Sequence, residues 1–380
     1  MRKVVCLAAL ASLFALVVSG AVLPAAWAQS APSQFKTDVT KPLAGVRTWG
    51  YQLQKTDPDV VAASSFDLVV VDYSRSGGDE GRFSADEVRA MQKKPDGSRR
   101  VVLAYLSIGE AESYRYYWGD NWVEPIRVFD MEDSASTPSG RGTLRVEPGT
   151  REIPTRALHV PKLTAPTWLG RENPDWGANF LVRYWDANWQ KIIFGSPNAY
   201  LDRILASGFD GVYLDRVDAF YAVADDRPQA KQDMVRFVAG IARHARKLKP
   251  GFLVVPQNGE ELLLEPAYLA TIDGIAKEDL LTGSGESGRR NSSRAIANSE
   301  KWLRAAQQAG LPVYVVEYVQ NAAKIESLRE ELVEKGFVPY FGVRTLDRLV
   351  ERQSSASPQS SGSSGSTASS PRASAGAHRR

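Results

Sequence analysis

The stretch GFDGVYLDRVDAF, residues 208–220, places two carboxylates where a short apolar run ends. A glycine turn opens a predicted strand in which Tyr213 and Asp215 share one face. Buried carboxylates are costly unless they are paired or take part in chemistry. Asp215 and Asp218 are therefore candidate catalytic groups, and the alternative is that they cap the helix that follows.

Eight short apolar runs of this kind recur along the chain, separated by amphipathic, helix-like stretches. Their near-continuous hydrophobicity predicts a parallel sheet that is covered on both faces. Eight strands alternating with helices predict a (β/α)8 TIM barrel, with a doubly wound open sheet as the alternative. The predicted strands are 46–53, 66–73, 100–108, 211–217, 252–258, 272–278, 312–318 and 337–343, and the predicted helices are 84–93, 198–208, 231–248, 292–310 and 322–336.

In such a barrel the active-site groups lie at the carboxyl ends of the strands. Nearly every predicted strand ends in a carboxylate, an amide, a phenol or an arginine, and together these groups predict a polar pocket. Glu278 ends the sixth strand as Asp215 ends the fourth. The expected substrate-binding residues at the strand ends are Tyr51, Asp72, Tyr105, Glu110, Asp218, Gln257, Asn258, Asp279, Glu317 and Tyr340.

Residues 109–190 are too many for an ordinary connection and predict a long Trp-rich insertion after strand 3. At its end, Tyr184 and Trp185 are expected to bind substrate at the barrel mouth, with Tyr184 near Asp215. Aromatic rings beside an active site can stack on sugars, and the alternative is that they pack the insertion's own core. The insertion holds six of the nine tryptophans, namely Trp118, Trp122, Trp168, Trp176, Trp185 and Trp189.

Chemistries that depend on a cofactor or on histidine find little support. The segment GSGESG at 283–288 matches a dinucleotide fingerprint, but it follows the sixth predicted strand rather than the first, which favours a loop. The chain has three histidines, and its one cysteine is Cys6. A catalytic triad, a histidine-rich zinc site and thiolate chemistry are therefore not expected. No cofactor and no metal are predicted, although the sequence leaves open a Ca²⁺ or Mg²⁺ site built from carboxylates.

Carboxylate chemistry remains. Hydrolysis of a glycosidic bond needs one group that protonates the departing oxygen and a second that attacks the sugar or activates water. Asp and Glu side chains supply both without a metal.

The two ends of the chain differ from its centre. Residues 1–28 predict a cleaved secretory signal, with an uncleaved membrane anchor as the alternative. Residues 29–43 are expected to be a linker, 44–352 the folded domain, and 353–380 a disordered Ser-rich tail. The protein is accordingly expected to be secreted, periplasmic or in the cell envelope, without stable membrane insertion once the signal is removed.

The charge balance bears on the partner. The chain carries 47 basic and 44 acidic residues. The excess of basic residues lies in the two terminal segments, which leaves the central body near neutral. Nucleic acid is therefore not an expected partner, because phosphate binding needs a basic face.

Several stretches, read in order, carry a family resemblance. The sequence resembles the polygalactosaminidase-like glycoside hydrolases of family 114 in VVLAYLSIGEAESYRYYW (101–118), FLVRYWDANWQKII (180–193), YLDRILASGFDGVYLDRVDAF (200–220), PQNGEELL (256–263) and IDGIAKEDLL (272–281). The resemblance implies a (β/α)8 barrel and retaining, endo-acting cleavage of α-1,4-linked galactosamine polymers.

The resemblance also implies site residues. It makes Asp215 and Glu278 the two catalytic acids, with Asp215 as nucleophile and Glu278 as general acid/base, although the sequence leaves these roles exchangeable. Members with the fungal pattern carry N-E-Q-C around the second acid, where this chain has A-K-E-D at 276–279. That departure bears on which substrate the protein binds rather than on the two-carboxylate chemistry.

A polysaccharide is the expected partner. A cationic galactosamine polymer would need anionic subsites, and the candidate acids are Asp72, Glu110, Asp218, Asp279 and Glu317. The alternative is that these acids cap loops or pair with Arg216, Lys277 and Arg344. The alternative function is a glycan-binding or envelope-associated barrel without turnover.

Overall fold

The structure is a computed structural model that describes residues 43–126, 158–283 and 288–351. The predicted signal, the predicted tail, nearly all of the predicted linker and the centre of GSGESG lie outside these residues.

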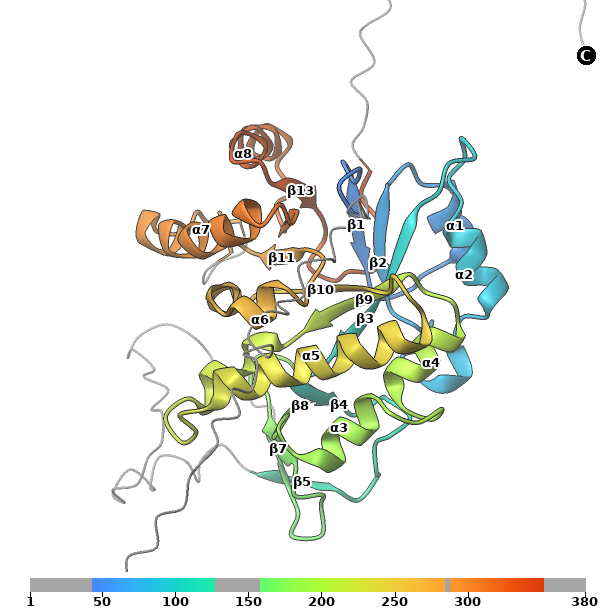
Figure 1. Ribbon diagram of the computed structural model, residues 1–380, viewed down its shortest axis with the longest axis vertical. Coiled ribbons are helices and arrows are strands. Elements are labelled where there is room, and N and C mark those ends of the chain that lie inside the picture. Colours follow the sequence, from blue (N-terminus) through green and yellow to red (C-terminus); the bar gives the residue numbers. More distant parts are fainter. Residues whose placement is uncertain (1–42, 127–157, 284–287, 352–380) are drawn as a thin grey trace, which may run out of the picture. The chain divides into compact units, whose positions relative to one another are not determined.

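Eight parallel strands form the barrel (Figure 1). All eight predicted strands are present, and the predicted (β/α)8 fold is confirmed. Their near-continuous apolar sequences are buried, as expected for a sheet covered on both faces. The strands are β1 Trp49–Gln52, β2 Leu68–Val71, β3 Val101–Ser107, β9 Gly211–Asp215, β10 Leu253–Pro256, β11 Ile275–Glu278, β12 Val313–Glu317 and β13 Val338–Phe341.

The strands pair in the orders β1-β2-β3-β9-β10 and β11-β12-β13, which leaves two seams in the barrel. At the seam between β10 and β11, Asp273 N donates to Val254 O and Asn258 N donates to Ala276 O, each at 2.9 Å. At the other seam, Trp49 Nε1 donates to Val338 O of β13 at 2.9 Å. Hydrogen bonds therefore cross both seams.

Helices follow the strands around the outside of the barrel (Figure 1). Side-chain caps fix several of their starts, as in α2, where Ser84 and Glu87 form a capping box. The five predicted helices appear as α2 Ala85–Met91, α4 Tyr200–Ala206, α5 Ala230–Leu248, α7 Ser293–Gln308 and α8 Ala322–Glu334. The short helices α1 Pro58–Ala63, α3 Ala187–Ile193 and α6 Pro266–Leu269, and the 3-10 turns η1 Asp79–Gly81, η3 Val217–Val223 and η4 Glu260–Leu264, were not predicted.

Between β3 and α3 the described residues form antiparallel strands that periodicity did not predict. A three-stranded sheet has the order β4-β8-β7, and β5 pairs with β6. Four indoles from this segment and α3 pack in a row, with ring centroids 5.4 Å apart for Trp118–Trp122 and Trp122–Trp168 and 4.9 Å for Trp168–Trp189. These four rings therefore pack against one another. The strands are β4 Glu110–Glu112, β5 Val123–Ile126, β6 Leu158–Pro161, β7 Leu169–Glu172 and β8 Asn179–Val182.

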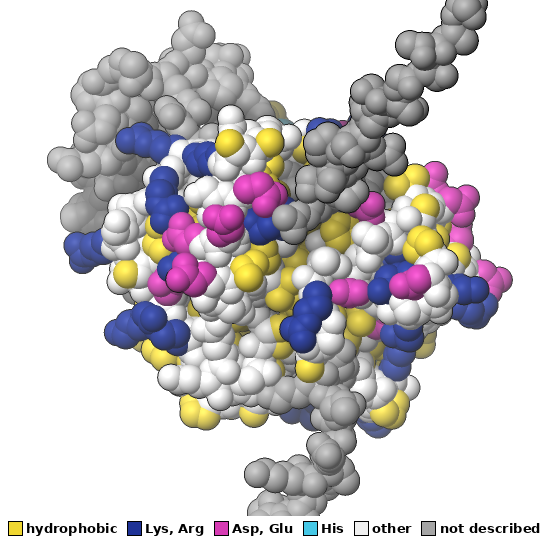
Figure 2. Space-filling model, turned by 90° about the horizontal axis from the view of Figure 1, so that it is seen from above, with side chains coloured by type: hydrophobic (Ala, Val, Ile, Leu, Met, Phe, Trp, Pro, Cys, Tyr) yellow, Lys and Arg dark blue, Asp and Glu magenta, His cyan; other side chains and the backbone are white. Residues whose placement is uncertain are grey.

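Two surface properties bear on possible partners. Figure 2 shows basic and acidic side chains interspersed over one face of the described residues, rather than gathered into a broad basic area. None of the helices in the described part of the chain has both the length and the apolar character needed to span a membrane.

Candidate active site

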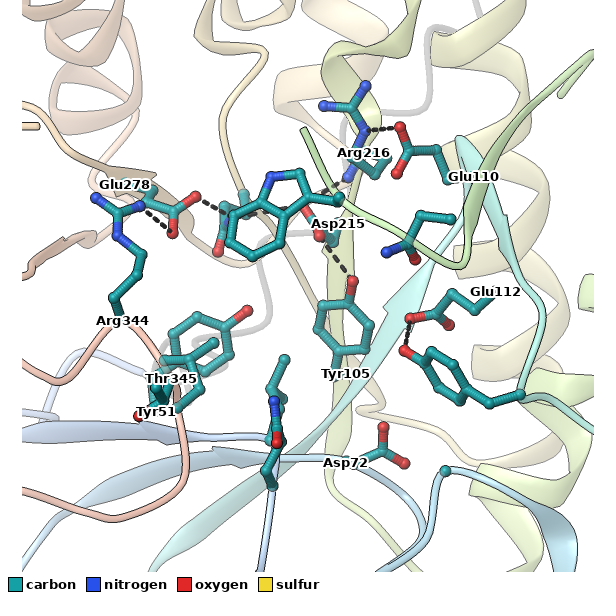
Figure 3. Close-up of a pocket in the computed structure, with 18 of the residues that line it drawn as sticks. Tyr51, Asp72, Tyr105, Glu110, Glu112, Asp215, Arg216, Glu278, Arg344 and Thr345 are labelled. Atoms are coloured by element: carbon teal, nitrogen blue, oxygen red, sulfur yellow. Dashed lines mark hydrogen bonds and ion pairs between the residues drawn. The ribbon is translucent and has the colours of Figure 1, made fainter. Parts of the chain in front are cut away.

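A cavity of about 650 Å³ lies at the carboxyl ends of the barrel strands (Figure 3). Residues at or after the carboxyl ends of all eight strands line it, and the segment between β3 and α3 supplies part of its wall. Of the predicted site residues, those that line the cavity are Tyr51, Asp72, Tyr105, Glu110, Asp215, Gln257, Asn258 and Glu278.

One amide joins the two predicted catalytic acids across the seam between β10 and β11. Asp215 is the last residue of β9 and Glu278 the last of β11, and Gln257 follows β10 between them. Gln257 Nε2 donates to Asp215 Oδ1 at 3.3 Å and to Glu278 Oε2 at 3.1 Å. The Tyr213 hydroxyl donates to Gln257 Oε1 at 2.6 Å, which fixes the amide with its NH₂ group toward the acids. The two carboxylate oxygens are therefore separated by at most the sum of the two bridging distances, about 6.4 Å.

A tyrosine hydroxyl holds the second oxygen of each acid. Tyr105 donates to Asp215 Oδ2 at 2.7 Å, and Tyr318 donates to Glu278 Oε1 at 2.6 Å. The Arg344 guanidinium lies 3.8 Å from the same Glu278 oxygen. Hydrogen bonds of this kind favour the charged form of a carboxyl group, and burial opposes it.

Burial has the larger effect on both acids. It raises the pKa of Asp215 to about 6, against the lowering effect of the Tyr105 hydrogen bond. It raises the pKa of Glu278 to about 7, against the Tyr318 hydrogen bond and with a further upward contribution from the charge of Asp215. Glu278 therefore keeps its proton to a higher pH than Asp215 does.

The three strands that carry these groups each end in a left-handed residue. Arg216, Asn258 and Asp279 follow β9, β10 and β11 with φ of 60°, 60° and 53°. Left-handed backbone is unfavourable for residues with a Cβ atom and gathers at functional sites. The Arg216 backbone N–H donates to Asp215 Oδ1 at 2.7 Å. A Cβ atom on Gly109 would lie 2.1 Å from Arg216 O, so this close approach requires glycine.

Arginines pair with the acids on the β2 and β3 side of the cavity. The Arg115 side chain, fully buried, contacts Asp72 Oδ2 at 2.8 Å and Glu112 Oε2 at 2.7 Å. Arg216 Nε lies 3.0 Å from Glu110 Oε1, and its Nη1 lies 3.3 Å from Asp218 Oδ1. The predicted alternative of pairing with Arg216 is therefore confirmed for Glu110 and Asp218, whereas the partner of Asp72 is the unpredicted Arg115.

The two remaining acids of the predicted anionic set, Asp279 and Glu317, are not among the residues that line the cavity. Asp279 Oδ2 accepts from Arg344 Nη2 at 2.7 Å. Glu317 is fully buried and accepts from the backbone N–H groups of Leu281 at 2.6 Å and Thr282 at 3.0 Å. Neither acid lines the cavity, nor does Asp218. The prediction of direct substrate binding is therefore wrong for Glu317, which is fully buried. For Asp218 and Asp279, whose side chains are 26% and 22% exposed, it stays a prediction, and the predicted alternative of pairing with Arg344 is confirmed for Asp279.

The predictions for Tyr184 and Tyr340 are wrong, because both side chains are buried, and Trp185 is not among the residues that line the cavity. Tyr184 is fully buried and its hydroxyl donates to Ala230 O at 2.9 Å, because the end of the segment packs on the start of α5 rather than on the cavity. Trp185 packs against the Arg227 guanidinium, 4.3 Å from the ring centroid. Tyr340 packs inside the barrel, its ring 5.6 Å from that of Trp49.

Three aromatic residues that sequence analysis did not assign to the site line the cavity: Tyr318, which bonds to Glu278, Tyr114 and Trp176. Tyr114 is 47% exposed, and Trp176, in the turn between β7 and β8, is 54% exposed. Trp176 lies in N-P-D-W-G-A-N, residues 173–179, whose Asn, Pro, Asp and Gly residues are typical of an exposed turn. This turn composition could have indicated from the sequence that Trp176 is exposed, unlike the tryptophans that pack against one another.

Known proteins give an independent comparison. The model of glycoside-hydrolase family GH114 matches residues 156–357. A Deinococcus radiodurans protein is 36% identical over 85% of this chain and 91% of its own length, and a Methanocaldococcus jannaschii protein is 33% identical over 79% and 77%. Both are named only as uncharacterized proteins.

Two solved structures share the fold. The glycoside hydrolase domain of PelA from Pseudomonas aeruginosa has a TM-score of 0.53 and 17% identity, over 80% of this chain and 98% of that one. Aspergillus fumigatus Ega3, solved in complex with galactosamine, has a TM-score of 0.51 and 16% identity, over 82% and 96%. Family match, relatives and fold agree: the chain belongs to glycoside hydrolase family 114 and is a glycoside hydrolase.

Proposed function

We propose that the protein is an endo-acting hydrolase of an α-linked, galactosamine-type polysaccharide that works by a two-carboxylate retaining mechanism. The observation that carries the mechanism is the Gln257 amide, which bonds to Asp215 and Glu278 at once. The substrate class is supported by Ega3, which shares the fold and was solved with galactosamine. The composition of residues 1–28 supports action outside the cytoplasm.

The bridging amide places the two acids at a spacing that is compatible with retention. Carboxyl groups lie about 5–5.5 Å apart in retaining glycosidases and about 6.5–9.5 Å apart in inverting ones, which need room for a water molecule. The Gln257 bridge holds Asp215 Oδ1 and Glu278 Oε2 within about 6.4 Å of each other, an upper limit that is compatible with the retaining spacing.

The surroundings of each acid support its role. Glu278, with its pKa raised to about 7, holds the proton that the departing sugar oxygen needs. Asp215 ionises at lower pH and attacks the anomeric carbon, so that a covalent glycosyl-enzyme forms as the glycosidic C–O bond breaks. Glu278, now deprotonated, then takes a proton from the water that hydrolyses this intermediate.

The stereochemistry of the first product tests this proposal. An α-linked oligosaccharide is hydrolysed in an NMR tube, and the anomeric signals are followed before mutarotation. Retention gives the α-anomer first. Initial formation of the β-anomer would rule out the retaining mechanism, and tight binding without turnover would favour the glycan-binding alternative.

The two raised pKa values predict a bell-shaped pH profile. We expect kcat/KM to be highest between about pH 6 and pH 7, because Asp215 must be ionised and Glu278 protonated. Activity should fall below that window as Asp215 takes up a proton and above it as Glu278 loses one. Initial rates from pH 4 to 9 on one oligosaccharide measure the two limbs. A plateau that extends unchanged beyond pH 9 would contradict the role of Glu278 as the acid.

Trp176 is expected to bind a sugar ring in a subsite next to the acids. Trp176→Ala should raise KM on an oligosaccharide by roughly tenfold, because ring stacking of this size contributes on the order of 1 kcal/mol, and should leave the melting temperature nearly unchanged. Leu264→Ala, at a side chain that is 57% exposed and outside the cavity, is the matched control. A KM equal to that of the control would remove Trp176 from the site.

A further inference from the structure

The two carboxylate oxygens of Asp215 have different partners. Oδ1 accepts two hydrogen bonds, from Arg216 N at 2.7 Å and from Gln257 Nε2 at 3.3 Å. Oδ2 accepts one, from the Tyr105 hydroxyl at 2.7 Å. Each oxygen of a carboxylate has about two lone pairs that can accept hydrogen bonds. Within the described residues both lone pairs of Oδ1 are therefore used, and one lone pair of Oδ2 is left without a donor.

The donors to Oδ1 are held by the barrel wall itself. The Gln257 backbone N–H donates to Leu214 O at 2.8 Å, and the Tyr213 hydroxyl donates to Gln257 Oε1 at 2.6 Å, so the amide is fixed at both ends. The other donor belongs to the main chain of the residue next to Asp215. These contacts engage Oδ1 before a sugar arrives, and they leave Oδ2 as the oxygen with a lone pair for bond formation.

Tyr105 reaches Oδ2 from the neighbouring strand. In the register between β3 and β9 it lies opposite Tyr213, two positions before Asp215, and so on the same face of the sheet. Figure 3 shows its hydroxyl directed at the Asp215 carboxylate. The side chain is 8% exposed and lines the cavity. A sugar carbon that meets Oδ2 therefore also lies close to the Tyr105 hydroxyl.

We propose that Asp215 Oδ2 is the oxygen that attacks the anomeric carbon, and that Tyr105 is a catalytic residue whose hydroxyl donates to this oxygen when the oxygen carries charge. Oδ1, held by Gln257 and by the Arg216 N–H, becomes the carbonyl oxygen of the glycosyl ester. This inference rests on the proposed function and adds to it the reacting atom and a third catalytic side chain.

The charge on Oδ2 disappears and returns during one turnover. In the first step a lone pair of Oδ2 forms the bond to the anomeric carbon, the glycosidic C–O bond breaks with its electron pair on the departing oxygen, and that oxygen takes the proton of Glu278. In the second step water attacks the anomeric carbon and gives a proton to Glu278. The electron pair of the ester C–O bond returns to Oδ2, and Asp215 is a carboxylate again.

The Tyr105 hydroxyl therefore accelerates the second step more than the first. It already bonds to charged Oδ2 in the free enzyme, so it adds little on the way to the first transition state. In the glycosyl-enzyme that charge is absent, and the hydrogen bond strengthens as the ester breaks. An interaction accelerates a step when it is stronger in the transition state than in the state before it.

The structure of a trapped glycosyl-enzyme tests the choice of oxygen. A 5-fluoro α-glycosyl fluoride of a galactosamine oligosaccharide is the probe, because fluoride leaves readily and the ring fluorine slows hydrolysis of the ester. We expect the anomeric carbon on the oxygen beside Tyr105, with the other oxygen still bonded to Gln257 Nε2 and Arg216 N. A bond to the oxygen held by Gln257 and Arg216 overturns the inference and leaves the retaining mechanism intact. An adduct on Glu278 contradicts the proposed roles of the two acids as well.

Tyr105→Phe tests the timing, and its kinetics decide the inference if no adduct accumulates. The substrate is a galactosamine oligosaccharide with a dinitrophenyl α-leaving group at pH 8, where departure needs no proton and Glu278, with a pKa of about 7, is ready to act as base. We expect kcat to fall roughly 10–100-fold, because a hydrogen bond to a charged group is lost in the second step, while kcat/KM changes by no more than a few-fold. KM falls accordingly, and a burst of dinitrophenol precedes the steady state.

Tyr184→Phe is the matched control. Its hydroxyl also makes a buried hydrogen bond, to Ala230 O, but the residue does not line the cavity. KM of this variant should equal that of the wild type. If kcat and kcat/KM fall together in Tyr105→Phe, with KM unchanged and no burst, the hydroxyl has no special part in the second step and the inference is overturned.

Discussion

Asp215→Asn and Glu278→Gln are each expected to lower kcat by roughly 10²–10⁴-fold or more, since each removes one half of the two-carboxylate mechanism. Each replacement preserves the size of the side chain and most of its hydrogen bonds, so the melting temperature of the protein should change little. Asp86→Asn, which alters an 86% exposed carboxylate of α2, is the matched control and should leave kcat unchanged. Activity within a few-fold of wild type in either catalytic variant would remove that residue from the mechanism.

Azide rescue of the same variants assigns the two roles. In the variant that lacks the acid/base, the glycosyl-enzyme still forms on a substrate with a good leaving group, and azide captures it to give the α-glycosyl azide. In the variant that lacks the nucleophile, azide attacks the substrate directly and gives the β-glycosyl azide. We expect α-azide from Glu278→Gln and β-azide from Asp215→Asn. The opposite assignment would exchange the roles of the two residues.

Arg115→Met is expected to destabilise the protein by about 3–5 kcal/mol, because it leaves Asp72 and Glu112 buried without a counter-charge. The free energy of unfolding at neutral pH, from urea titration followed by tryptophan fluorescence, measures the loss. Arg89→Met is the control, since Arg89 is 71% exposed and its pair with Asp86 contributes about 0–1 kcal/mol.

A rescue variant keeps this prediction testable if Arg115→Met does not fold. Combining Arg115→Met with Asp72→Asn and Glu112→Gln removes all three charges together, and most of the lost stability should return. If the triple variant is no more stable than Arg115→Met, packing of the Arg115 side chain is the dominant contribution rather than its charge.

The strands and the position of the acids could be predicted because both follow from local sequence and one rule of topology. Apolar runs in alternation with helical segments predict parallel strands, and parallel strands in a barrel bring their carboxyl ends together. Asp215 and Glu278 could therefore be assigned to one cavity although 63 positions separate them in the chain. The same rule failed for Glu317, which ends a strand but is fully buried and accepts hydrogen bonds from the backbone of Leu281 and Thr282.

The remaining features of the site could not be predicted, because they depend on contacts between parts of the chain that are distant in sequence. Nothing local distinguishes Tyr184, buried under α5, from Tyr114, which faces the cavity. The partner of Asp72 lies 43 positions away in a segment without helical or alternating periodicity. The left-handed backbone at Arg216 runs against the preference of any residue with a Cβ atom, so propensity predicts the opposite.

The seam between β10 and β11 links the spacing of two barrel strands to the distance between the two catalytic acids. Asp215 lies on the β10 side of this seam and Glu278 on the β11 side, so the distance between the acids depends on how β10 and β11 are held together as well as on the Gln257 bridge. A slight widening there lengthens the gap between the acids, and a slight narrowing shortens it. Stiffening replacements in the packing beneath β10 and β11 would thus tune turnover from a distance, without altering any group that the sugar touches.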